Sequence, residues 1–271
     1  LKSSDYEFIQ GDICDTELLE GLLPGFDVVI NFAAESHVDR SISNSKEFIS
    51  SNIVGTYTLL NSAMKNNVRT FLQVSTDEVY GSISNGSWNE ECALSPNSPY
   101  SASKASADLL CLAYKRTHGM DIRVTRSSNN FGTHQNAEKF IPKVITNLIK
   151  GEQVPVYGDG MNIRDWIHVD DNCRALHQVL LSGNAGGVYN IGGGNELTNL
   201  ELVNLILQIM ELKSEMVLFV KDRAGHDSRY SVDVGKIQSE LGFYPKVDFE
   251  NGLADTINWY RNNQSWWNTS S

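Results

Sequence analysis

The sequence predicts an α/β protein in which a doubly wound parallel sheet is followed by a smaller, mixed α/β second domain. Three observations lead to this prediction. Short apolar runs alternate with amphipathic helical patterns through the first half of the chain. After about residue 132 this alternation becomes less regular. The chain has 271 residues, of which 41% are hydrophobic, and this is enough for two lobes with a cleft between them.

Four short buried strands are expected in the first half. They cover residues 6–10, 27–34, 69–75 and 121–128. Two helices, at residues 46–66 and 98–117, place apolar side chains on one face at three-to-four residue spacing. Repeated strand–helix–strand units form right-handed crossovers in a parallel sheet. Ligands of such sheets bind beyond the carboxyl ends of the strands, so that edge is where a site is expected.

Helical patterns dominate the second half. Helices are expected near residues 138–150, 170–181, 199–211 and 249–262, with one strand at residues 188–191. This part of the chain is expected to form the second domain.

Charge and composition exclude several classes of function. The 33 acidic and 22 basic residues give a net charge of -11 without a basic cluster, which argues against nucleic acid as a partner. The apolar runs are too short and too interrupted to cross a membrane. Because the four cysteines stand alone, without metal-ligand spacing, neither a metal site nor a disulfide framework is expected, and a reducing cytoplasm is the expected location.

Tyr100 and Lys104 form a Tyr-x-x-x-Lys pair at the start of the second expected helix. Four residues of helix place both side chains on one face, about one turn apart. An ammonium beside a phenol favours the phenolate, as a base for a hydroxyl group requires, because free tyrosine has a pKa of about 10. Taken alone, the pair also fits a surface lysine beside a half-buried tyrosine.

A second motif, Ser75–Gly81, follows directly on the strand expected at residues 69–75 and so lies at its carboxyl end. Its adjacent carboxylates, Asp77 and Glu78, also fit a helix cap or a solvent-facing turn. Together with Tyr100, they favour an active site.

Matching stretches extend through almost the whole chain, and on them the sequence resembles the extended short-chain dehydrogenases/reductases, most closely the NAD-dependent nucleotide-sugar 4,6-dehydratases. The stretches are residues 11–15, 31–39, 75–81, 98–104, 128–132, 138–139, 157–160, 164–166 and 222–227. The resemblance implies a Rossmann-type fold, with an NAD-binding domain at residues 1–134 and a nucleotide-sugar domain mainly at residues 135–271. Some segments of the second part are expected to return to the first domain.

The resemblance also implies a reaction and roles for its residues. Tyr100 would take the proton of the sugar 4-hydroxyl, with Lys104 on the nicotinamide ribose and Thr76 near the 4-oxygen. Glu78 would remove the C5 proton and Asp77 would protonate the departing 6-hydroxyl, giving a 4-keto-6-deoxy sugar. This neighbouring carboxylate pair separates dehydratases from epimerases that share Tyr-x-x-x-Lys.

Binding residues follow from the same resemblance. On the cofactor side they are Asp12, Ile13, Ala33, Ala34, Glu35, Ser75, Tyr100 and Lys104. On the substrate side they are His37, Thr76, Asn129, Lys139, Phe140, Pro155, Tyr157, Arg164, Asn199, Arg223 and His226. Taken singly, each arginine also fits a surface salt bridge, and the two alanines fit strand-end packing. Relatives pair through two long helices, so a homodimer through residues 46–66 and 98–117 is expected.

Some features depart from the family pattern. The Gly-rich turn and the acidic residue one strand later are absent, and since the chain begins at Leu1, both are expected upstream. Thr133, His134, Phe140 and Ala224 replace residues usual in the family. The expected substrate is dTDP-glucose. The alternatives are a UDP-glucose 4,6-dehydratase, a UDP-sugar 4-epimerase or decarboxylase, and a silent nucleotide-sugar binder.

Overall fold

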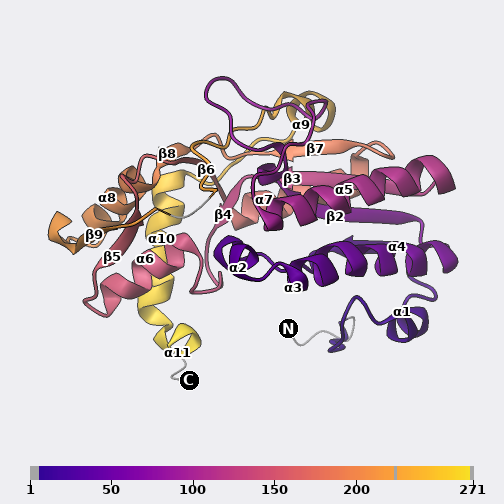
Figure 1. The fold of residues 1–271 in the computed structure, drawn as a ribbon, viewed down its shortest axis with the longest axis horizontal. Helices are drawn as coiled ribbons and strands as arrows, with labels where there is room; N and C mark the ends of the chain where they lie inside the picture. The colour runs from indigo at the N-terminus through magenta and orange to yellow at the C-terminus, as the bar shows by residue number, and fades with distance from the viewer. Residues whose placement is uncertain (1–5, 223–224, 269–271) are drawn as a thin grey trace.

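Four parallel strands form the central sheet of the first lobe in the computed structural model, which describes residues 6–222 and 225–268 (Figure 1). Their order is β1 (Val28–Asn31), β2 (Thr70–Thr76), β3 (Asp121–Ser127) and β7 (Val188–Ile191). Every neighbouring pair is parallel. All four strands therefore present their carboxyl ends at the same edge, and the predicted α/β class is confirmed.

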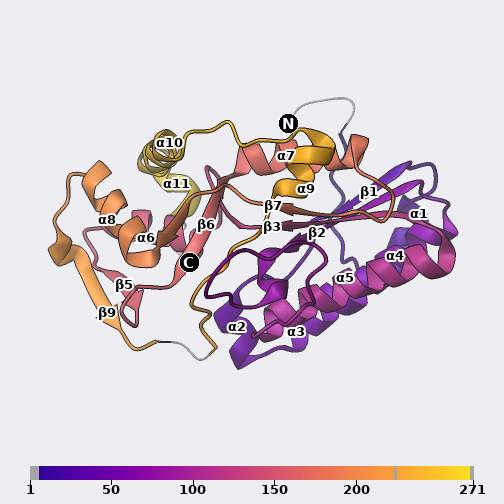
Figure 2. The same ribbon diagram turned by 90° about the horizontal axis from the view of Figure 1, so that it is seen from above.

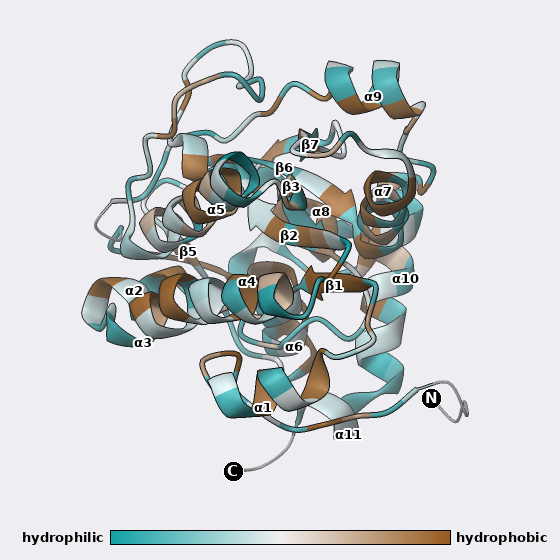
Figure 3. Cartoon of the chain, turned by 90° about the vertical axis from the view of Figure 1, so that its right-hand side faces the viewer, coloured by the Kyte–Doolittle hydropathy of each residue, from teal (hydrophilic) through white to brown (hydrophobic). Residues whose placement is uncertain are grey.

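Helices cover both faces of this sheet. On one face α5 (Pro99–His118) packs on β2 and β3 beside α4 (Thr56–Lys65), and on the other lie α7 (Val169–Ser182) and α9 (Gly235–Leu241) (Figure 2). Apolar residues fill both interfaces, as the brown strands β1 and β2 show in Figure 3. None of the helices in the described part of the chain is long and apolar enough to cross a membrane.

The second lobe combines two small sheets with helices. One sheet has the order β4 (Asn129–Phe131), β6 (Ile163–His168) and β8 (Glu196–Thr198), and the other pairs β5 (Val154–Tyr157) with β9 (Val217–Val220). The helices are α6 (Phe140–Ile149), α8 (Asn199–Ile209), α10 (Phe249–Asn262) and α11 (Gln264–Trp267). Their buried side chains form one core, which includes Ile145, Ile206 and Tyr260.

The first predicted strand is wrong. Residues 6–10 are extended but form no strand, and the apolar side chains of Tyr6, Phe8 and Ile9 are 53%, 74% and 44% exposed. A β-strand needs a neighbour to accept its hydrogen bonds. None of the described strands pairs with residues 6–10, so this segment has no neighbour to accept its backbone hydrogen bonds.

The helix predicted at residues 46–66 is interrupted. Between α3 (Lys46–Phe48) and α4, residues Ile49–Gly55 form a π-helical segment. Within it, the buried Asn52 accepts from the Glu35 backbone N–H at 2.8 Å and donates to the Glu35 carbonyl at 2.9 Å. It also donates to Ser103 Oγ of α5 at 2.8 Å. A π-bulge of this kind is common near functional sites.

Several short elements were not predicted. They include α1 (Thr16–Leu22), α2 (Val38–Ser43), a 3₁₀ turn at Asp77–Tyr80 and a second at Ser214–Met216. The helices predicted at residues 98–117, 170–181, 199–211 and 249–262 and the strand at 188–191 are confirmed to within two residues at each end. The helix predicted near 138–150 begins at Phe140.

Candidate active site

The carboxyl end of β2 and the start of α5 bring the two sequence motifs together. Thr76 ends β2 and caps the 3₁₀ turn, its Oγ1 accepting from the Glu78 backbone N–H at 3.3 Å. Ser98 caps α5 through a reciprocal capping box with Ser101, and Pro99 occupies the first turn. These local signals place Tyr100 next to Thr76, with which it shares a hydrogen bond.

Asp77 is buried at the end of β2, beside Thr76. Its side chain is 3% exposed, and Oδ1 accepts from Thr76 Oγ1 at 3.2 Å. Oδ2 is buried without a hydrogen-bond partner among the described residues. Burial, followed by the charges of Glu78 and Asp165, raises the pKa of Asp77 well above its usual range. This shift favours the protonated acid, the form that can donate a proton.

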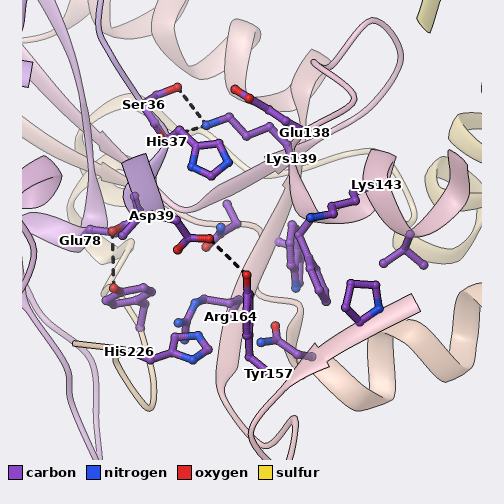
Figure 4. Close-up of a pocket in the computed structure, with 18 of the residues that line it drawn as sticks. Ser36, His37, Asp39, Glu78, Glu138, Lys139, Lys143, Tyr157, Arg164 and His226 are labelled. Atoms are coloured by element: carbon purple, nitrogen blue, oxygen red, sulfur yellow. Dashed lines mark hydrogen bonds between the residues drawn. The ribbon is translucent and has the colours of Figure 1, made fainter. Parts of the chain in front are cut away.

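Glu78 is less buried and faces the cleft beside Tyr230. The Tyr230 hydroxyl donates to Asp227 Oδ2 at 2.6 Å and lies 3.5 Å from Glu78 Oε2 (Figure 4). Burial, and then the charge of Glu78, raises the pKa of Tyr230, so this tyrosine stays neutral. Two neighbouring carboxyl groups in different surroundings are suited to opposite proton-transfer roles.

Tyr100 and Lys104 lie on the buried face of α5. Lys104 Nζ donates to the Val74 carbonyl of β2 at 2.7 Å, and burial lowers the pKa of this lysine. Burial and the charge of Glu78 raise the pKa of Tyr100, and the Thr76 hydrogen bond only partly opposes them. The pKa of Tyr100 therefore moves in the direction opposite to our prediction, because desolvation of the phenol and the charge of Glu78 outweigh the Thr76 hydrogen bond.

A pocket extends from Glu78 between the lobes (Figure 4). Nine of the predicted substrate residues line it: His37, Asn129, Lys139, Phe140, Pro155, Tyr157, Arg164, Asn199 and His226. Thr76 lines the adjoining cavity, together with Asp77 and Tyr100. The predicted Arg223 lies outside the described residues.

Cationic side chains occupy the middle of this pocket. Lys139 Nζ donates to the Ser36 carbonyl at 2.7 Å and lies 2.9 Å from Ser36 Oγ. The Arg164 guanidinium lies 4.3 Å from the Tyr230 ring centre and donates to the Asp227 carbonyl at 3.0 Å. In a protein of charge -11, these are fixed positive charges toward which a diphosphate is attracted.

Aromatic rings line the far end. Tyr157 and His226 contact each other edge to face, with ring centres 6.2 Å apart. His226 Nδ1 lies 2.7 Å from Asp222 Oδ1, and Tyr157 donates from its hydroxyl to Asp39 Oδ2 at 3.3 Å. Flat rings with fixed polar groups beside them are suited to a planar base.

Five of the predicted cofactor residues line neither the pocket nor the adjoining cavity: Asp12, Ile13, Ala33, Ala34 and Glu35. Ala33, Ala34 and Glu35 follow β1, and Glu35 is tied to the π-helical segment by Asn52. At the other end of that segment, Ile13 approaches Gly55 so closely that a Cβ on the glycine would lie 2.6 Å from its side chain. Asp12 lies in the same exposed turn, where its Oδ1 accepts from the Cys14 N–H at 2.8 Å.

Ser75 lies nearest to the catalytic motif among these cofactor residues. Its side chain is buried, and a hydrogen bond from it lowers the pKa of the buried Asp108. Ser75 lines the same cavity as Tyr100.

Sequence reasoning missed several residues of the site. Tyr230, Asp39 and Lys143 line the pocket, and the buried Asp165 raises the pKa of Asp77. Asp39 and Asp165 lie inside stretches that match the family, and that match could have identified them as site residues. Tyr230 and Lys143 have no spacing relation to either motif. Within the described residues, no group of three or more histidine, cysteine or acidic side chains could hold a metal ion.

Comparison with known proteins identifies close relatives. A family model described as GDP-mannose 4,6 dehydratase matches residues 1–256. A dTDP-glucose 4,6-dehydratase from Actinoplanes sp. is 56% identical over 262 residues, which cover 97% of this chain and 82% of the relative.

Solved structures show the same likeness. DesIV, a dTDP-glucose 4,6-dehydratase from Streptomyces venezuelae with NAD bound, matches with a TM-score of 0.97 at 52% identity, covering 98% of this chain and 83% of that one. A UDP-glucose 4-epimerase from Thermotoga maritima with UDP-glucose matches with a TM-score of 0.91 at 28% identity, covering 97% and 86%. The fold is thus common to both activities, and the higher identity lies on the dehydratase side.

Proposed function

The chain belongs to the GDP-mannose 4,6 dehydratase family, and from this we propose that it is an NAD-dependent hydro-lyase that converts dTDP-glucose to the 4-keto-6-deoxy sugar. One observation carries the dehydration step. Asp77, which is buried and whose pKa is raised by that burial, stands directly before Glu78 and lines the same cavity as Tyr100. Loss of water needs an acid and a base at one place, whereas epimerisation at C4 does not.

NAD is the cofactor, and when bound it supplies a hydride acceptor for C4 and a hydride donor for C6. Tyr100, Lys104 and Ser75 would hold the nicotinamide end. Ala33, Ala34 and Glu35 would line its middle, and Asp12 and Ile13 the adenine. The position of Ser75 in the same cavity as Tyr100 supports this placement.

Oxidation at C4 begins with removal of a proton. Tyr100 must first lose its own phenolic proton to solvent, and as the phenolate it takes the proton of the 4-hydroxyl, while Thr76, already bonded to Tyr100, holds the 4-oxygen. Lys104 supplies positive charge at the phenolic oxygen and the ribose. The Thr76 hydrogen bond partly opposes the burial that raises the pKa of Tyr100.

Elimination uses the two carboxyl groups. The 4-ketone acidifies C5, and Glu78 takes the C5 proton as the bond from C6 to its oxygen breaks. Asp77 gives its proton to that oxygen, which leaves as water. Glu78 then returns a proton to C5 when C6 is reduced, so the net change is loss of one water molecule.

The remaining pocket residues bind the substrate away from the reacting carbons. We assign Asn129, Lys139, Phe140 and His37 to the sugar and diphosphate. Arg164 and Arg223 are assigned to the phosphates. Pro155, Tyr157, Asn199 and His226 are assigned to the nucleoside, where the aromatic contact of Tyr157 with His226 supports a stacking surface.

The domain division and the cellular location belong to the same proposal. Residues 1–134 bind NAD, and residues 135–271 bind mainly the nucleotide sugar, although β7 contributes to the first sheet. Limited proteolysis of the loop near residue 134 tests this boundary. The protein works in the cytoplasm, which cell fractionation tests, and its four cysteines are free.

A mass measurement tests the function directly. We expect the protein, given dTDP-glucose in heavy water, to release a product that has lost one water and gained one non-exchanging deuterium at C5. The deuterium enters because Glu78 exchanges its proton with solvent before returning it. UDP-glucose is the matched control, because uracil lacks the methyl group of thymine. Burial of that methyl group contributes about 1 kcal/mol of binding free energy. An unchanged mass, or a change of configuration at C4 without loss of water, would reject the proposed reaction.

We also propose a homodimer formed through α4 and α5. Apolar side chains on the solvent side of these helices are exposed, with Tyr57 at 48% and Leu109 at 57%. Exposed apolar side chains on adjacent helices favour a helix–helix interface. We expect the double variant Tyr57→Glu/Leu109→Glu to be a monomer in sedimentation velocity. Leu181→Glu on α7, which is also exposed, is the matched control and should leave the dimer intact. A monomeric unmodified protein would contradict this proposal.

A further inference from the structure

The 3₁₀ turn Asp77–Tyr80, which carries both carboxyl groups of the site and is called the catalytic turn below, ends in a buried tyrosine. Tyr80 is 1% exposed and lines neither the pocket nor the adjoining cavity. It therefore lies behind the site and not among the residues assigned to the substrate. A 3₁₀ turn is short and its internal hydrogen bonds have poor geometry, so its position depends on contacts with the rest of the fold.

The Tyr80 hydroxyl bonds to two neighbouring strands of the central sheet. It accepts from Nη1 of Arg126 on β3 at 2.7 Å and donates to Oδ1 of Asn190 on β7 at 2.9 Å. Arg126 and Asn190 are partners in the register of these two parallel strands, and both are buried. The hydroxyl is thus bonded to one fixed point of the sheet.

Both partners of the hydroxyl are held by further segments. Arg126 donates from Nε to Oδ2 of the buried Asp108 on α5 at 2.9 Å. Asn190 donates from Nδ2 to the Trp88 carbonyl at 2.9 Å and to the Asp233 carbonyl at 3.2 Å. Neither side chain can turn away from Tyr80 without breaking these bonds as well.

The ring of Tyr80 and the residue after it are also held. The Arg126 guanidinium lies 4.8 Å from the centre of the ring, within the range of a cation–π contact. The Trp88 ring stacks on that of Tyr80, with centres 6.3 Å apart and planes at 19°. Trp88 Nε1 also donates to the Gly81 carbonyl at 3.2 Å. The end of the catalytic turn is therefore fixed through a hydroxyl, a ring and the next backbone carbonyl.

We propose that Tyr80 is a positioning residue that holds the catalytic turn in register with Tyr100. The hydrogen bonds of Arg126 reach both halves of the site, since they extend from Tyr80 to Asp108 on α5, the helix that bears Tyr100. Register matters because a proton donor or acceptor must lie within hydrogen-bond reach of the reacting atom, and a displacement of about 1 Å can slow a step about 100-fold. This inference rests on the proposed function, because the turn serves the elimination step.

A purely structural role is the competing explanation. Without the Tyr80 hydroxyl, a buried guanidinium N–H of Arg126 and the buried amide oxygen of Asn190 lose a partner, which destabilises a fold whatever the turn does. A general loss of stability acts on all steps and on binding alike. A displaced turn slows the step that uses its carboxyl groups, and leaves nucleotide binding and C4 oxidation close to those of the unmodified protein.

The test is Tyr80→Phe, which keeps the ring but removes the hydroxyl. We expect kcat for dTDP-glucose to fall by about 10- to 100-fold. The rate of NAD reduction in rapid mixing and the dissociation constant of dTDP should hardly change, so reduced NAD should accumulate before the slow elimination. Amide hydrogen exchange at residues 77–81, measured without substrate, should become about tenfold faster, because the turn opens more often.

Tyr189→Phe is the matched control. Tyr189 on β7 is also buried, and its hydroxyl also makes two hydrogen bonds, from the Asn184 N–H and to Glu240 Oε2, both at 2.9 Å. Neither of these partners belongs to the catalytic turn or to its anchors. We expect Tyr189→Phe to lower the melting temperature but to keep both kcat and the exchange rate of residues 77–81. Circular dichroism melting curves ensure that each variant is assayed while folded.

An unchanged exchange rate at residues 77–81 in Tyr80→Phe would overturn the inference, and so would an unchanged kcat. A loss of activity that appears equally in NAD reduction, in dTDP binding or in Tyr189→Phe would also overturn it, because a general loss of stability would then explain the result. Since hydrogen exchange is measured without substrate, it remains decisive if the unmodified protein fails to dehydrate dTDP-glucose. That failure would reject the proposed function separately.

Discussion

Replacing Glu78 by glutamine is expected to stop the loss of water while leaving oxidation at C4 intact. Glutamine keeps the shape of the side chain but cannot take the C5 proton. A positioned base contributes about 10²- to 10⁴-fold to such a step, so turnover should fall by that factor. Rapid mixing with dTDP-glucose should then show reduced NAD accumulating in its absorbance band, because the 4-ketone forms but goes no further.

The outcome separates the two activities found on this fold. In a C4-epimerase residue 78 transfers no proton. The Glu78→Gln variant would then keep its turnover, and its product would differ from the substrate only in configuration at C4. Glu201→Gln is the matched control: Glu201 caps α8 through Thr198, and glutamine can make the same capping contacts. Full turnover by Glu78→Gln, or loss of NAD reduction together with turnover, would contradict the assignment of Glu78 as the C5 base.

The sequence predicted the chemical core of the site because that core is local. Thr76, Asp77 and Glu78 follow one strand directly, and Tyr100 and Lys104 share the first turns of one capped helix. Backbone hydrogen bonding and caps fix such short segments, and both leave a signature in neighbouring residues. Their meeting at one edge follows from the parallel order of β1, β2 and β3.

Residues that act across the fold could not be predicted in the same way. Tyr230 reaches Glu78 from a segment 152 residues later in the chain. Asp108 contacts Arg126 because α5 packs on β3, and the spacing of the two residues in the sequence does not predict this pair. The regular helix predicted at residues 46–66 is interrupted by a π-helical segment, in which Asn52 bonds to the Glu35 backbone, and no local pattern shows that contact.

The same limit explains the failed strand. The apolar side chains of Tyr6, Phe8 and Ile9 satisfy the local pattern of a strand, but strand formation depends on a neighbour. Local pattern and tertiary pairing agree for residues 188–191. The predicted strand forms there because β3 lies alongside and accepts its hydrogen bonds. A sequence pattern thus predicts which segments are able to pair, and the packing of the whole chain decides which of them do.

Tyr100→Phe is the second large effect, and it is expected to stop the reaction one step earlier than Glu78→Gln. Phenylalanine fills the same space against Phe48, whose ring contacts that of Tyr100 edge to face with centres 6.3 Å apart. The pocket should therefore still bind the nucleotide sugar. The 4-hydroxyl loses its base, so NAD reduction and overall turnover should fall together by about 10²- to 10⁴-fold.

Comparison of Tyr100→Phe with Glu78→Gln shows which reaction step each of the two residues serves. Tyr114→Phe, on the same helix, is the matched control, since that tyrosine bonds only to Asn61 among the hydrogen bonds of the described residues and lies outside the pocket. Calorimetric binding of dTDP-glucose should be similar in Tyr100→Phe and the unmodified protein, which rules out a simple loss of affinity. If Tyr100→Phe still reduced NAD at the unmodified rate, another group would be taking the hydroxyl proton. Since Thr76 and Glu78 are the nearest alternatives, the role of Tyr100 would then reduce to packing.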